Sequence, residues 1–123
     1  MKWHYLFMII MFASPIYAFS VGVISCNTNS MYPTFDCHSK IETTGIYNYN
    51  PVQVGDIVRY PITMQMRLDN KKYGWGYNFN GITYILHRIY NITEKGFITK
   101  GDNNQNPDPW IVIPWTVTMK VIK

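Results

Sequence analysis

The sequence has no cluster of basic residues. Its eleven Lys and Arg, set against seven Asp and Glu, give a net charge of +4 and are scattered from Lys2 to Lys123. They form neither a basic run nor a stripe at helical spacing, the patterns that mark a nucleic-acid-binding surface. We therefore expect no nucleic-acid partner. The excess charge is interpreted as a solvated surface, which would also suit a domain that rests against anionic lipid.

Metal-binding side chains are scarce as well. The chain has two cysteines, Cys26 and Cys37, and three histidines. A zinc site built from Cys26, Cys37 and His38 would lack a fourth ligand at useful spacing, so we expect no metal. Two interpretations of the cysteines stay open. One is a disulfide, which would close a short loop and persist in an exported domain, and the other is a pair of partly buried free thiols.

Helical periodicity is missing after the first 18 residues, and there is no internal repeat or low-complexity tract. Short runs rich in Val, Ile, Tyr and Thr are instead bounded by Gly, Pro, Asn or Asp, which is typical of strands and turns. The segment LDNKKYGWGYNFNG (68–81) carries turn residues and predicts a β-hairpin with a mobile tip. The sequence thus predicts one mainly β domain over residues 19–123, with strands at 19–25, 40–44, 56–62, 82–92, 96–100 and 115–122.

The start of the chain holds its one long uncharged stretch, Tyr5 to Ser25, preceded by Lys2. Residues 1–18 have the length of a signal peptide, while the whole stretch could remain as a single-pass membrane anchor. In either version Lys2 favours a cytoplasmic N-terminus, so the domain that follows should face outward. We expect a membrane location with the domain on the outer face, or secretion after the leader is removed.

Reactive side chains occur where predicted strands end or where one interrupts an apolar run. Ser30 follows the first strand, His87 lies inside the strand at 82–92, and Asp102 and Asp108 lie in the loop after residue 100. A serine hydroxyl becomes nucleophilic when a neighbouring base takes its proton, and a third group can orient that base. These residues could fill the three roles, although spacing alone leaves open which aspartate orients the histidine.

Four segments occur in a recognisable order: TNSMYPT (28–34), GDIV (55–58), HRI (87–89) and KGDNN (100–104), with Asp108 following. Together they resemble the conserved boxes of type I signal peptidases. The resemblance is closest to the subgroup of the endoplasmic-reticulum complex, archaea and some bacteria, in which histidine stands where the common bacterial enzymes have lysine. The segment GDIV is interpreted as a tight turn that leads into a strand.

The resemblance implies a role for each reactive residue. Ser30 would be the acylated nucleophile and His87 the general base. Asp108 matches the essential carboxylate of the family, and Asp102 matches a second acid that supports the site. Thr28 stands where these enzymes usually have a serine, and its hydroxyl would form the oxyanion hole with the backbone N–H of Ser30.

The resemblance also implies the fold and the activity. We expect a compact core of coiled β-sheets behind the N-terminal leader or anchor. Its activity would be that of a serine endopeptidase that removes leader peptides from exported proteins without a cofactor. The substrate would dock as an added strand beside the segments leading to Ser30 and His87. Met31 and Leu86 would line small pockets for residues such as Ala.

Other interpretations remain. Ser30 could cap a turn, His87 could be a core histidine, and either aspartate could merely shape a loop. The protein could also be a specialised conjugation- or phage-type peptidase with one dedicated substrate. From a different class, it could be a secreted binding module that uses its ten Tyr and four Trp as a contact surface. Whether partner subunits are needed is left open.

Overall fold

The computed structural model describes residues 19–23, 29–35, 40–45 and 52–121. The expectations for the leader at 1–18, for Cys26 with Cys37, and for Thr28 fall outside these residues. Among the described residues, no helix has the length and apolar character needed to cross a membrane.

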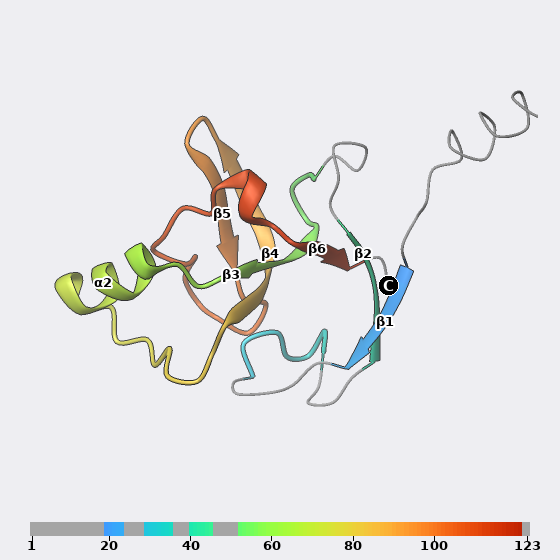
Figure 1. Cartoon of the computed structure of the whole chain (residues 1–123), viewed down its shortest axis with the longest axis horizontal. Coiled ribbons are helices and arrows are strands. Elements are labelled where there is room, and N and C mark those ends of the chain that lie inside the picture. Colours follow the sequence, from blue (N-terminus) through green and yellow to red (C-terminus); the bar gives the residue numbers. More distant parts are fainter. Residues whose placement is uncertain (1–18, 24–28, 36–39, 46–51, 122–123) are drawn as a thin grey trace, which may run out of the picture.

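Within the described residues, six strands form a single antiparallel sheet in the order β1-β2-β6-β3-β4-β5 (Figure 1). The prediction of a mainly β chain is confirmed. The strands are β1 (Phe19–Val23), β2 (Lys40–Gly45), β3 (Ile57–Pro61), β4 (Tyr84–Thr93), β5 (Gly96–Lys100) and β6 (Met119–Val121).

The strand predicted at 115–122 is partly wrong. Pro114–Thr116 form a short 3-10 helix, η1, and the strand that follows is confined to β6. Pro114 suits the first turn of a helix because its ring fixes φ and it has no N–H to leave unpaired. The Thr116 hydroxyl donates to the carbonyl of Ile113 at 2.6 Å and closes the turn.

The hairpin predicted at 68–81 is also wrong, because much of this segment belongs to the helix α2 (Met64–Tyr73). The Thr63 hydroxyl caps its start by accepting from the N–H of Met66 at 3.2 Å. Gly74 ends it in the left-handed conformation, with φ 64°. Met66 is the one buried residue of α2, so the helix has no apolar stripe for a periodicity test to detect.

Arg67 ties the chain that returns from α2 to the helix. Its guanidinium donates to the carbonyls of Phe79 and Ile82 at 3.0 and 2.7 Å. Two charge-assisted bonds to main-chain oxygens hold a segment that has little regular structure of its own. Phe79 can therefore reach the core from an irregular segment.

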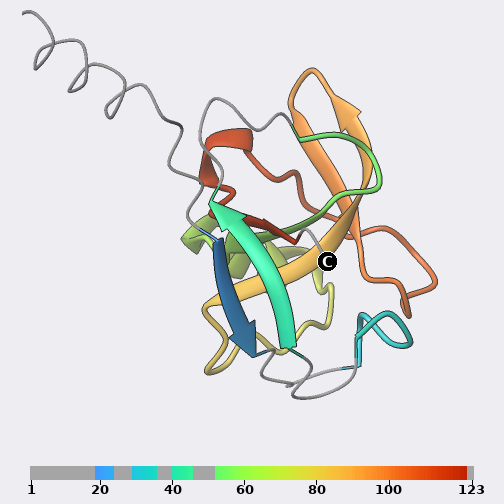
Figure 2. The same ribbon diagram turned by 90° about the vertical axis from the view of Figure 1, so that its right-hand side faces the viewer.

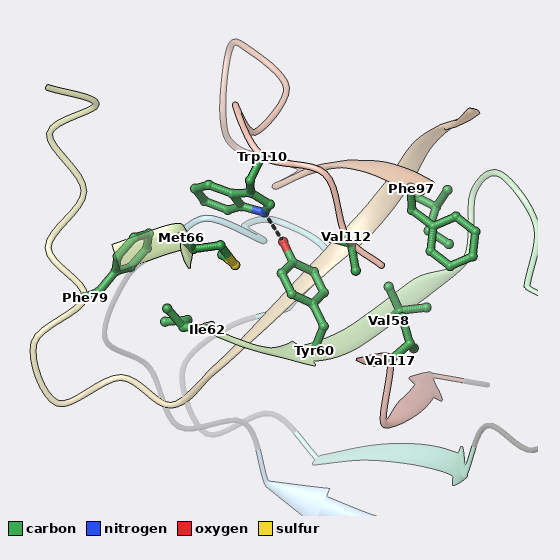
Figure 3. Packing of buried hydrophobic residues seen from close by; sticks show 10 residues of the cluster. Val58, Tyr60, Ile62, Met66, Phe79, Phe97, Trp110, Val112 and Val117 are labelled. Carbon is green, nitrogen blue, oxygen red and sulfur yellow. Dashed lines mark hydrogen bonds between the residues drawn. The ribbon is translucent and has the colours of Figure 1, made fainter. Parts of the chain in front are cut away.

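The hydrophobic core lies between the β3–β4–β5 part of the sheet and the chain that carries α2, Phe79 and Trp110 (Figure 3). Alternation along β3 places Val58 and Tyr60 in this core, while Arg59 between them is only half-buried. The core cluster consists of Val58, Tyr60, Ile62, Met66, Phe79, Ile89, Phe97, Trp110, Val112 and Val117.

The sheet register brings three distant segments together. In β4, His87 lies opposite Val58 of β3, and Arg88 lies opposite Lys100 at the end of β5. The loop that leaves β5 therefore starts beside the middle of β4. The turn at 29–35 lies next to this loop in both views, and the N–H of Asn103 donates to the carbonyl of Ser30 at 2.7 Å (Figures 1 and 2).

Candidate active site

Ser30 lies in a tight turn that is tied to the loop after β5. Within the turn, the N–H of Tyr32 donates to the carbonyl of Asn29 at 3.0 Å, and that of Phe35 to the carbonyl of Met31 at 3.1 Å. Met31 is buried, and its sulfur accepts the N–H of Asp102 at 3.4 Å. Both the main chain of Ser30 and the side chain of Met31 thus anchor the turn to the neighbouring loop.

Ser30, His87 and Asp108 lie in one line of hydrogen bonds. His87 Nε2 is 3.1 Å from Ser30 Oγ, and His87 Nδ1 is 2.6 Å from Asp108 Oδ2. A carboxylate only accepts hydrogen bonds, so Nδ1 carries the proton and Nε2 is left to accept the serine proton. His87 and Asp108 are 6% and 5% exposed, which shields the imidazole and the carboxylate from solvent.

Buried polar side chains surround the Asp108 carboxylate. Thr99 Oγ1 donates to Asp108 Oδ2 at 2.7 Å, and Tyr60 Oη lies 2.7 Å from Thr99 Oγ1 and 3.4 Å from the same Oδ2. The indole N–H of Trp110 donates to Tyr60 Oη at 3.0 Å. Burial, and then the charge of Asp108, raise the pKa of Tyr60 well above its usual value, so the phenol stays protonated.

Asp102 has different partners. Arg88 donates to its two oxygens at 2.9 and 2.8 Å in a bidentate pair, and the hydroxyl of Thr34 also donates to it. The hydrogen bonds from Arg88 are the main cause that lowers the pKa of Asp102. The guanidinium of Arg88 also donates to the carbonyl of Gly55 at 2.8 Å. Asp102 therefore joins the turn at 29–35 to β4 and to the turn before β3.

The two aspartates thus differ in the side chains that bind them. Among the residues that the structure describes, Asp108 contacts the ring of His87, and Asp102 is bound by Arg88 and Thr34. Whether Asp102 supports the site, as the family resemblance implies, stays a prediction. Its catalytic contribution, like the roles of the other site residues, stays a prediction.

Gly101 allows the three segments to approach closely. A Cβ at this position would lie 2.7 Å from the carbonyl oxygen of Ser30 and 3.0 Å from His87 Nε2. It would also lie 2.7 Å from the side-chain nitrogen of Asn104. Real Cβ atoms essentially never come so near, so a side chain here would push the serine turn away from β4.

The structure describes both predicted substrate-binding residues, Met31 and Leu86, and also the predicted turn at GDIV. Met31 is buried against the loop, whereas Leu86 is half-buried on β4 beside His87. Their contact with a substrate stays a prediction. The expected turn before β3 is present, because the N–H of Asp56 donates to the carbonyl of Gln53 at 3.1 Å.

Sequence reasoning missed Tyr60, Thr99 and Trp110. A detectable signal was present for Thr99, because it lies two positions after the apolar Phe97 and so shares its face of β5, which the structure shows to be buried. A hydroxyl on the buried face of a strand needs a hydrogen-bond partner. The partner could not be named, because Thr99 and Tyr60 are 39 positions apart in the chain.

Within the described part of the chain, no group of three or more His, Cys, Asp or Glu side chains could hold a metal ion. Comparisons of the chain with protein-family models, curated proteins and solved structures found no match. The functional argument therefore rests on the residues and their geometry. A serine hydroxyl, an imidazole and a buried carboxylate in this arrangement can perform acyl transfer.

Proposed function

We propose that the protein is a serine endopeptidase of the signal peptidase I type, with Ser30 as nucleophile and His87 as general base. The observation that carries the proposal is the continuous contact from Ser30 Oγ through His87 to Asp108, with distances of 3.1 and 2.6 Å. These residues come from a turn, a strand and a loop that are far apart in the chain. Their resemblance to the family's ordered boxes supports the same assignment.

In the proposed reaction, Ser30 Oγ attacks the carbonyl carbon of the scissile peptide while its proton passes to His87 Nε2. Asp108 holds Nδ1–H and stabilises the imidazolium that forms. Collapse of the tetrahedral intermediate breaks the C–N bond, and Nε2 returns its proton to the leaving amine. A water molecule then repeats these steps against the acyl-enzyme and frees the serine. The expected oxyanion donors are the N–H of Ser30 and the hydroxyl of Thr28.

The proposed substrate is an extended leader peptide at the outer face of a membrane. In the sheet order of the described residues, β1 is terminal and pairs with β2 alone. An unpaired strand edge can accept a peptide as an added strand through main-chain hydrogen bonds. β1 ends at Val23, a few positions before Ser30 in the sequence, and we propose this edge as the docking strand. We keep the membrane attachment of residues 1–18 as part of this proposal.

The full chain, incubated with preproteins that have Ala before the cut, should release the leader. Ser30→Ala and His87→Ala should each reduce cleavage by about a thousandfold or more, because each removes a group that acts in every bond-making step. Thr118→Ala is the matched control, since its hydroxyl bonds to Arg59 rather than to the triad. Wild-type cleavage should fall along one acid limb, because a protonated imidazole cannot accept the serine proton.

Substantial activity in the folded His87→Ala protein would refute the proposal. If the wild-type chain cleaves one dedicated partner and ignores a broad preprotein panel, the alternative of a specialised processing peptidase is correct. If wild-type and Ser30→Ala proteins bind a partner equally and neither cleaves, the chain is a binding module. Mass measurement of the products and of the mature N-terminus distinguishes these results.

A further inference from the structure

The Asp108 carboxylate is contacted on one side by a chain of buried donors that the proposed reaction does not itself require. Trp110, Tyr60 and Thr99 follow one another toward Asp108 Oδ2, with separations of 3.0, 2.7 and 2.7 Å (Figure 3 shows the bond from Trp110 to Tyr60). Tyr60 and Thr99 are 1% and 0% exposed, so water cannot replace these bonds.

The direction of each bond follows from the number of protons available. The indole of Trp110 can only donate, and the Asp108 carboxylate can only accept. Thr99 has one hydroxyl proton, which goes to Asp108 Oδ2 at 2.7 Å, so Tyr60 must donate to Thr99. If Thr99 donated to Tyr60 instead, Tyr60 would have to donate to Asp108 Oδ2 at 3.4 Å, a longer and weaker bond. All three dipoles therefore point toward the carboxylate.

The bonds converge on a single oxygen. Asp108 Oδ2 receives both His87 Nδ1–H and the Thr99 hydroxyl, while Oδ1 is buried and has no hydrogen-bond partner among the described residues. A carboxylate held at one oxygen could turn about its axis if one of the donors were lost. The Thr99 bond opposes that rotation, and it also neutralises part of the charge that faces the imidazole.

We propose that Trp110, Tyr60 and Thr99 act as positioning residues that hold Asp108 Oδ2 against His87. This inference deepens the proposed peptidase function and rests on it for its kinetic test. Thr99 is the direct contact with the carboxylate. Tyr60 and Trp110 keep the Thr99 hydroxyl pointing toward Asp108. None of the three touches the reacting atoms, so none is a catalytic residue.

The first test compares Thr99→Val with Thr99→Ser in the full chain. The valine retains the branched shape and removes the hydroxyl, whereas serine keeps the donor. We expect Thr99→Val to lower kcat roughly tenfold with KM little changed, a loss of the size that one hydrogen bond to a charged group carries. Its acid limb should also move to higher pH, because the less neutralised carboxylate holds the protonated imidazole more strongly. Thr99→Ser should keep the wild-type profile.

Other titratable groups near the site are the same in all of these proteins. The charge of Asp108 raises the pKa of Tyr60 and of Tyr77, while Arg88 and Lys100 lower the pKa of Asp102 beside β4. None of them is altered in the Thr99 variants. The matched control is Thr93→Val, which removes the hydroxyl that closes the β4–β5 turn. It should lower thermal stability without moving the pH profile.

A second measurement does not depend on cleavage. The proton on His87 Nδ1, held by a carboxylate, should give a far-downfield proton NMR signal that disappears in Asp108→Asn. Thr99→Val should shift this signal and Tyr60→Phe should shift it less, whereas Thr99→Ser and Thr93→Val should leave it in place. If the signal and the pH profile are the same in Thr99→Val and wild type, the inference is overturned.

The two proposals fail in different ways. Cleavage that survives Ser30→Ala would refute the peptidase assignment, while the NMR comparison would still decide whether the donor chain acts on His87 and Asp108. Cleavage that is lost in Ser30→Ala but unchanged in Thr99→Val would leave the peptidase assignment in place and refute the positioning role.

Discussion

Asp102 and Asp108 lie six positions apart in one loop, yet they occupy opposite kinds of environment. Asp108 is buried and meets the imidazole of His87, and Asp102 is partly exposed and meets the guanidinium of Arg88. The same side chain can orient a base in one setting and join loops in the other. Removing each carboxylate should therefore affect different measurable properties.

We expect Asp108→Asn to lower kcat by about a hundredfold to ten-thousandfold, because the amide misorients the base without removing the nucleophile. The loss should be smaller than in Ser30→Ala. Asp102→Asn should change kcat much less and leave the pH profile of cleavage in place. Kinetics on a peptide substrate with matched folding controls would check this, and equal losses in both variants would contradict it.

Loop and strand elements approach one another closely at Gly101. The turn at 29–35 contacts the loop after β5 through the carbonyl of Ser30 and the sulfur of Met31. Gly101 lies at the point where this turn, the loop and His87 of β4 converge. The separation between Ser30 Oγ and His87 Nε2 is thus set by how closely two irregular segments pack against one strand.

Gly101→Ala should widen that separation, since its Cβ would otherwise lie 2.7 Å from the Ser30 carbonyl oxygen and 3.0 Å from His87 Nε2. A displacement of about 1 Å in a catalytic group can cost on the order of a hundredfold in rate. We expect a loss of that size in kcat. Asn103→Ala is the control, because it leaves the backbone N–H that binds Ser30 unchanged. Similar activities in the two variants would argue against this geometry.

At the scale of the whole molecule, two of the hydrogen-bonded side chains behind Asp108, Tyr60 and Trp110, belong to the hydrophobic core. Tyr60 belongs to the hydrophobic core cluster, while its hydroxyl forms hydrogen bonds with Thr99 and Trp110. Core stability and site geometry therefore depend on the same residue. The pH dependence of stability gives a way to observe this link.

Burial raises the pKa of Tyr60 in the folded protein above its ordinary value of about 10. Above pH 10 the unfolded chain therefore binds fewer protons than the folded one, and stability should fall as pH rises. The stability that the neutral Tyr60 phenol contributes is fully present below about pH 10, and it is lost as the pH rises toward the pKa of Tyr60 in the folded protein. At pH 8, Tyr60→Phe should lower the free energy of unfolding by about 1–3 kcal/mol, because Thr99 and Trp110 lose their hydrogen-bond partner. Between pH 8 and 11, however, the variant should lose less stability than the wild type.

Urea unfolding of both proteins across this pH range measures the difference. Parallel alkaline losses in wild type and Tyr60→Phe would show that Tyr60 does not carry this linkage. The activity of the same samples at neutral pH reports separately on the site.

The sequence by itself determined the mainly β character, because alternating Val, Ile, Tyr and Thr between turn residues leaves few other structures. It also singled out Ser30, His87 and the two aspartates, because they lie at strand ends or interrupt an apolar run and because their segments resemble the ordered boxes of a known family. It failed at α2, where the signals were a threonine cap and a terminal glycine rather than an apolar stripe.

Only the tertiary structure decided which aspartate meets His87 and which donors surround it. Tyr60, Thr99 and Trp110 contact one another across 39 and 50 positions of the chain. Such contacts depend on the register of β3, β4 and β5 and on the path of the loop after β5. Local residue patterns set which face of a strand a side chain occupies, but the partner that it meets there is set by the packing of the whole sheet.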